Sequence, residues 1–130
     1  MPFRIDEMLL VEVGQARFPD GTKFETSTPI SRVVVVESFP ARLNWHVAVK
    51  FTADARSTVA FDADVIAPRG PRSVAHLKFV AEPGSGREEF PLPVFTAPEK
   101  GVYTVHLYVN GATTPSASEG ILVDVAASLA

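Results

Sequence analysis

The stretch from Glu99 to Gly111 constrains the fold of this chain more than any other, because apolar residues alternate through it. One side of the extended chain consists of Tyr103, Val105, Leu107 and Val109. The other side consists of Thr104, His106 and Tyr108. Successive side chains of a strand point to opposite faces of the sheet, so this period of two predicts a half-buried antiparallel strand. We expect the Tyr103 side of this strand to lie in the core.

Much of the remaining chain repeats this pattern in short runs separated by proline and glycine. Valine, which is stiff at its branched Cβ and suits strands, recurs in these runs. The other expected strands are Glu7–Val13, Lys23–Ser27, Arg32–Glu37, Asn44–Thr52, Ser57–Ile66, Val74–Val80 and a last one that contains Ile121, Val123 and Val125. The sides expected in the core include Trp45, Val47, Val49 and Phe51, and also Val59, Phe61, Ala63 and Val65.

Turn and loop residues divide these strands. Pro19–Thr22 is typical of a tight turn, and Pro40 is expected to break the chain over Ser38–Arg42. Glu82–Arg87 is expected to be a loop, and the prolines within Phe90–Val94 allow an edge strand at most. About eight or nine short strands predict an all-β fold. We expect one domain over residues 1–130, a single antiparallel β-sandwich that is immunoglobulin-like in the broad sense, with Tyr103 placed as in a tyrosine corner.

Four consecutive valines, Val33–Val36, do not fit a strand with one wet face. The first strand is also apolar on both of its sides. Two interpretations remain open. Either loops or the Pro91–Phe95 segment cover this surface, or it packs against a second copy of the chain as a homodimer.

Charge and composition exclude several function classes. The formal net charge is −3 and cysteine is absent, which excludes disulfides and thiolate metal sites. The only close pair of arginines, Arg69 and Arg72, brackets a Gly-Pro turn, so nucleic-acid binding is not expected. No apolar run approaches the roughly 20 residues of a membrane helix. The expected location is the cytoplasm, away from the membrane.

Three histidines and two aspartates are the candidates for a functional site. His46, His76 and His106 each fall on an outward side, and three histidines are a common zinc ligand set. In an immunoglobulin-like order the Trp45 and Tyr103 strands can share a sheet, which would bring His46 near His106. Asp62 and Asp64 project from one face roughly 7 Å apart and could bind calcium or act as acid and base on a glycoside. The alternative for all five residues is a solvated strand face, and the sequence leaves open whether they converge.

No nucleophile or phosphate-binding motif is present. Gly84-Ser85-Gly86 lacks the strand–turn–helix context of a hydrolase serine, and no helix is expected that could bind an anion at its N-terminus. The sequence therefore predicts that the chain is not an enzyme, with no catalytic, cofactor-binding or metal site and no cofactor.

The Asp20-Gly21 turn, the run from Val35 to Leu43 and the Gly101-Val102-Tyr103 strand that ends at Asn110-Gly111 together resemble a bacterial family of small proteins of unknown function. The resemblance implies a bacterial β-sandwich and assigns no functional residue.

The leading functional hypothesis from the sequence is a non-enzymatic, accessory module that binds a protein partner. The first alternative is a carbohydrate- or metal-binding domain that uses His46, Tyr108 and the Asp62/Asp64 pair. The second is a structural subunit of a phage or another assembly.

Overall fold

The computed structural model describes residues 3–70 and 72–126, and its elements are all strands, so the chain is all-β. In chain order they are β1 (Phe3–Arg17), β2 (Lys23–Pro29), β3 (Val33–Val36), β4 (Ala41–Leu43), β5 (Trp45–Ala53), β6 (Ser57–Ile66), β7 (Arg72–Ala81), β8 (Gly84–Pro91), β9 (Phe95–Ala97), β10 (Gly101–Val109) and β11 (Ala117–Val125). Within the described ranges there is no helix of the length and apolarity needed to cross a membrane.

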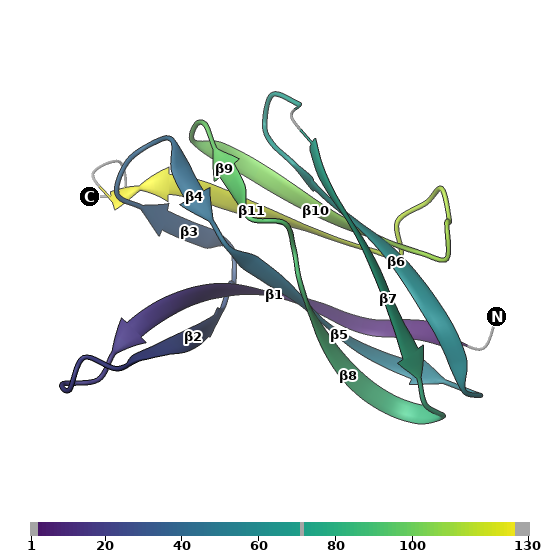
Figure 1. Ribbon diagram of the computed structural model, residues 1–130. Coiled ribbons are helices and arrows are strands. Elements are labelled where there is room, and N and C mark those ends of the chain that lie inside the picture. Colours follow the sequence, from purple (N-terminus) through teal and green to yellow (C-terminus); the bar gives the residue numbers. More distant parts are fainter. Residues whose placement is uncertain (1–2, 71, 127–130) are drawn as a thin grey trace.

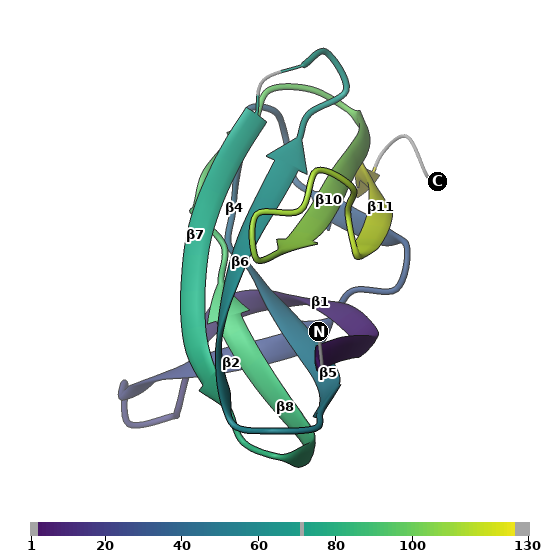
Figure 2. The ribbon, with the colours of Figure 1, turned by 90° about the vertical axis from the view of Figure 1, so that its right-hand side faces the viewer.

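The strands form two larger sheets and one small one (Figure 1). The first larger sheet has the order β2-β1-β5-β8, and the second has the order β3-β11-β10-β6-β7. β4 and β9 pair separately. Neighbouring strands are antiparallel except β3 and β11, which run parallel. Figure 2 shows β10 and β11 of the second sheet above β1 of the first.

Inward side chains of both larger sheets form one hydrophobic cluster. β5 contributes Trp45, Val47, Val49 and Phe51. β6 contributes Val59, Phe61, Ala63 and Val65. β10 contributes Tyr103, Val105 and Leu107. The predicted inward sides of these strands are confirmed. Burial of each large apolar side chain is worth about 1.5–3 kcal/mol, so these residues determine which face of each strand turns inward.

The valine run forms β3, an edge strand beside β11. Val34 is buried and Val36 packs against the cluster, while Val33 and Val35 are 44% and 52% exposed. The run therefore has one buried and one exposed side, as an ordinary edge strand has, although its sequence does not alternate.

The predicted loop at Glu82–Arg87 is wrong for most of its length, because β8 begins at Gly84 and pairs with β5. Gly84 has a positive φ of 101°, which starts the strand after a turn. At Gly86 a Cβ atom would lie 2.6 Å from the Phe51 ring. Glycine is thus required here by the close approach of an aromatic ring within a strand, and it does not mark a loop.

Two other boundaries also differ from the prediction. The expected break at Ser38–Arg42 contains a cis Phe39–Pro40 peptide, and the chain then enters β4, which pairs with β9. β1 is longer at both ends than Glu7–Val13, because its start pairs with β5 and its end pairs with β2. The turn expected between Arg69 and Arg72 is described except for Pro71, which lies outside the described residues.

Candidate functional site

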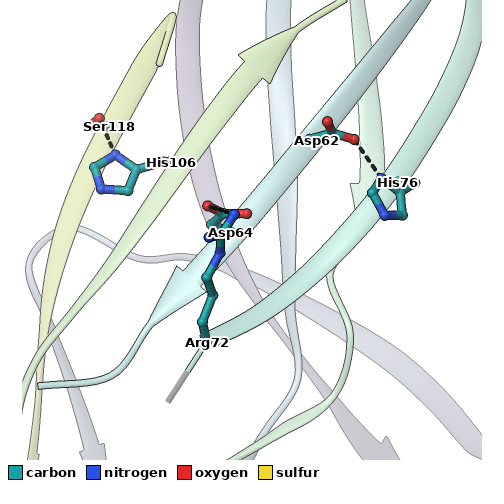
Figure 3. A network of polar contacts seen from close by, with 6 residues as sticks. All are labelled: Asp62, Asp64, Arg72, His76, His106 and Ser118. Carbon is teal, nitrogen blue, oxygen red and sulfur yellow. Dashed lines mark hydrogen bonds and ion pairs between the residues drawn. The ribbon is translucent and has the colours of Figure 1, made fainter. Parts of the chain in front are cut away.

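The outer face of the second sheet brings together five of the residues singled out in the sequence. Asp62 and Asp64 lie on β6, where Asp62 is the register partner of both His76 on β7 and Tyr108 on β10. Asp64 is the partner of His106 on β10. Figure 3 shows the two aspartates between the two histidines.

The two aspartates, the two histidines and Arg72 each have a partner on a neighbouring strand (Figure 3). His76 Nδ1 lies 2.6 Å from Asp62 Oδ1, and His106 Nδ1 lies 2.7 Å from the hydroxyl oxygen of Ser118. Arg72 Nη2 lies 2.8 Å from Asp64 Oδ2. The expected wet face is therefore correct for Asp62 but not for Asp64, which is only 1% exposed. Its Oδ1 atom has no hydrogen-bond partner among the described residues.

This face holds a shallow hollow of about 380 Å³ between β6, β7 and the loop after β10. Asp62, Arg72, His76 and Tyr108 contribute to its wall. Within residues 3–70 and 72–126, no group of three or more His, Cys, Asp or Glu side chains could hold a metal ion. The two aspartates and two histidines are thus neighbours in ion pairs and hydrogen bonds, without the convergence that a cation would need.

His46 lies apart from this face. It belongs to β5 in the first sheet, where its Nδ1 atom is 3.0 Å from Glu89 Oε2 on β8. The prediction that the Trp45 and Tyr103 strands share a sheet is wrong, because β5 and β10 belong to different sheets. The expected approach of His46 to His106 fails for the same reason.

Most of the twelve lysines and arginines are paired with carboxylates. The cations with a carboxylate within 4.0 Å are Arg4, Lys50, Arg56, Arg69, Arg72, Arg87 and Lys100. The cations without such an ion pair in the described part of the chain are Arg17, Lys23, Arg32, Arg42 and Lys78. Two of these, Arg17 and Lys23, are direct register partners at the end of the β1–β2 pairing.

The β1–β2 ribbon, residues 14–26, extends beyond the rest of the first sheet. The register of β1 with β5 ends at Glu12, whereas its register with β2 continues to the Arg17–Lys23 pair. Every residue of the ribbon is exposed except Ala16 and Thr26, which are half-buried. Figure 1 shows it reaching away from the other strands at the lower left. It is a two-stranded element with water on both faces.

Two phenylalanines lie at the end of the ribbon, outside the hydrophobic cluster. Phe18 is 51% exposed and Phe24 is 38% exposed, and their ring centroids are 4.4 Å apart. These two rings leave apolar surface in water, although burial would lower its free energy.

The predicted turn at Pro19–Thr22 is confirmed, and hydrogen bonds hold it in shape. The Phe18 backbone N–H donates to the Thr22 carbonyl at 2.8 Å, and the Gly21 N–H donates to the Phe18 carbonyl at 2.9 Å. Asp20 Oδ1 accepts from the Thr22 N–H at 2.8 Å, which lowers the pKa of the Asp20 carboxyl. The end of the ribbon, residues 17–24, is called the tip. Its aromatic rings and cations therefore flank an ordered turn.

Sequence reasoning missed this tip, although a signal for it exists. A cation precedes a phenylalanine on both arms of the turn, as Arg17-Phe18 and as Lys23-Phe24. The folded hairpin brings the two dipeptides together, whereas a search for runs of cations along the chain does not detect them.

No family model and no curated protein matches the chain. Among solved structures it is similar to the Pseudomonas fluorescens alkylpurine DNA glycosylase AlkC bound to DNA containing an abasic site analog. That match has a TM-score of 0.52 and 18% sequence identity, and it covers 95% of this chain. The chain spans 31% of the glycosylase chain. At this identity the likeness is one of fold.

This match corrects the functional expectation drawn from the sequence. A non-enzymatic protein-binding module was expected, with carbohydrate binding, metal binding or an assembly subunit as alternatives, and the solved protein of similar fold is instead a DNA glycosylase bound to DNA. The expected partners, a protein or a second copy with nucleic acid excluded, are contradicted by the same finding. The exclusion depended on cations clustered in sequence, and strand pairing brings Arg17 and Lys23 together without such a cluster.

Proposed function

We propose that the chain is a DNA-binding β domain that contacts the phosphate backbone with its β1–β2 ribbon. The similarity of fold to a protein bound to DNA supports the proposal. The match covers less than a third of the glycosylase, so the proposal concerns binding and not the chemistry of that longer protein.

The observation that carries the proposal is the position of Arg17 and Lys23. They are register partners on an exposed ribbon and have no ion pair within the described part of the chain. A phosphate can therefore bind them without first displacing a carboxylate, and charge-assisted hydrogen bonds are the stronger kind. A two-stranded ribbon is also narrow enough to enter the major groove of B-DNA, which is about 12 Å wide.

Two acidic groups lie near the tip, and neither forms an ion pair with Arg17 or Lys23 in the described part of the chain. Asp20 directs its Oδ1 atom to the Thr22 N–H inside the turn. Glu25 leaves the same face as Lys23, two residues further from the tip, and is the register partner of Gln15. The net charge of −3 opposes DNA at long range, so binding has to come from local contacts and will weaken with salt.

We also propose that the two larger sheets form an immunoglobulin-like sandwich. The parallel pairing of β3 with β11 supports it. The Tyr103 hydroxyl also donates to the Glu99 carbonyl at 2.6 Å, as the tyrosine does in a tyrosine corner. The bacterial family, the cytoplasmic location and the absence of enzymatic activity stay predictions.

The test is a pair of double variants with the same loss of charge. Arg17→Gln/Lys23→Gln removes the two cations of the tip, and Arg42→Gln/Lys78→Gln removes two other cations that lack an ion pair. We expect the tip variant to bind DNA at least about 10-fold more weakly at low salt. Its slope of log affinity against log salt should be smaller by about 1.5–2, since two phosphate contacts are lost.

Fluorescence anisotropy of labelled DNA over a salt series measures both quantities. The control variant loses the same net charge at positions away from the ribbon. It should therefore keep most of the affinity of the native chain for DNA. If both variants lose affinity equally, the ribbon is not the contact. If the native chain binds no DNA at low salt, the proposed function is wrong.

A further inference from the structure

The aromatic pair at the tip of the ribbon lies outside the core, and its ring–ring contact stabilises only the hairpin itself. Phe18 and Phe24 lie outside the hydrophobic cluster, and their ring–ring contact leaves about half of Phe18 exposed. Phosphate binding by Arg17 and Lys23 does not require aromatic rings. The pair therefore points to a second kind of contact at the same place.

The register of the ribbon separates rings from cations. Lys23 and Phe24 are consecutive on β2, so their side chains leave opposite faces, and Arg17 shares the face of Lys23. The Phe18 ring contacts the Phe24 ring and so lies on the other face. A ligand that uses both features has to present a flat apolar group to one face and a negative charge to the other.

A nucleotide has these two parts, joined by a sugar. Aromatic side chains stack on bases, and cations follow the phosphates, in proteins that bind single strands. In an intact duplex both faces of each base are covered by neighbouring bases, so a ring gains access only after unstacking. The tip therefore fits a base that is already unpaired.

We infer that the β1–β2 ribbon selects DNA with unpaired nucleotides, by stacking a base on Phe18 and Phe24 while Arg17 and Lys23 hold the adjacent phosphates. This inference rests on the proposed function and specifies its substrate class. Loss of one stacked base weakens binding by about 5- to 150-fold.

The experiment compares three labelled DNAs of one sequence: a single strand, the matching duplex, and the duplex with a central unpaired segment. The native chain should bind the first and third more tightly than the intact duplex. Phe18→Ala/Phe24→Ala should lose that preference and bind all three with the weaker affinity of the duplex. Phe18→Leu/Phe24→Leu keeps apolar volume without rings and should behave in the same way, so a folding defect of the alanine variant does not decide the result.

Val35→Ala/Val102→Ala is the matched control, because both valines are more than half exposed and belong to the second sheet. This control should keep the preference of the native chain. A leucine variant that still prefers unpaired DNA overturns the inference but leaves the proposed function standing. Equal binding of the three DNAs by the native chain also overturns the inference and leaves the proposed function standing. If the native chain binds none of the three DNAs, both the inference and the proposed function are wrong.

Discussion

At the residue scale, Tyr103 shows how one side chain joins packing to a backbone hydrogen bond. Its ring is fully buried, and its hydroxyl donates to the Glu99 carbonyl four residues earlier. Burial raises the pKa of the Tyr103 hydroxyl above its ordinary value of 10.0, so the group stays protonated and remains a donor. The alternating pattern predicted the inward direction of this side chain, and the structure confirms it.

Tyr103→Phe removes the hydroxyl and leaves the Glu99 carbonyl without this donor. We expect the free energy of unfolding to fall by about 1 kcal/mol, the usual net value of one hydrogen bond. Tyr108→Phe is the matched control, because Tyr108 is on the outward side of the same strand. Denaturant unfolding of both variants measures the difference. Equal stability of the two variants would show that the hydrogen bond of Tyr103 contributes nothing.

Asp64 marks the limit of prediction for single residues. Alternation along β6 predicts the side from which its carboxylate leaves the sheet, and that direction is correct. It does not predict depth, and the side chain is almost fully buried with Arg72 against it. Burial on an outward face depends on side chains from other strands, which the local pattern does not contain.

At the element scale, the strands that were predicted well are those with one buried face. The bounds of β6 agree with the prediction, and β5 and β10 agree to within one or two residues at each end. β8 was missed because Gly84 and Gly86 were interpreted as loop residues. For the ribbon the sequence predicts only the short strand Lys23–Ser27, because an element with water on both faces shows no apolar alternation.

The ribbon can be shortened to separate its role from folding. Replacement of residues 16–24 by Asn-Gly leaves Gln15 and Glu25 to flank a type I′ hairpin turn. None of the removed residues belongs to the hydrophobic cluster or packs against it. We therefore expect a thermal midpoint close to that of the native chain, and loss of DNA binding.

Thermal unfolding by circular dichroism and anisotropy with labelled DNA make the comparison. A shortened chain that folds and still binds DNA with native affinity would show that the ribbon does not contact DNA. The expected pair of results, folding kept and binding lost, would assign the ribbon to function.

At the scale of the whole molecule, the sequence predicted most of the strands and the all-β class but not which strands share a sheet. The Trp45 and Tyr103 strands have the same strong alternation, and nothing in either one specifies that β5 and β10 lie in different sheets. Which strands share a sheet depends on pairing between strands that are far apart in the chain. The sequence also does not show which cations become neighbours, because Arg17 and Lys23 are brought together only by the pairing of β1 with β2.

The proposed contact with DNA lies at the tip of the β1–β2 ribbon. The most direct test is a titration of isotope-labelled chain with a short single-stranded DNA, followed by backbone amide chemical shifts. We expect the largest changes in residues 17–24, with little change at His76 and His106 on the outer face of the second sheet. Changes centred on that outer face, or on the ion-paired Arg69, Arg72 and Lys100, with the ribbon unperturbed, would contradict it.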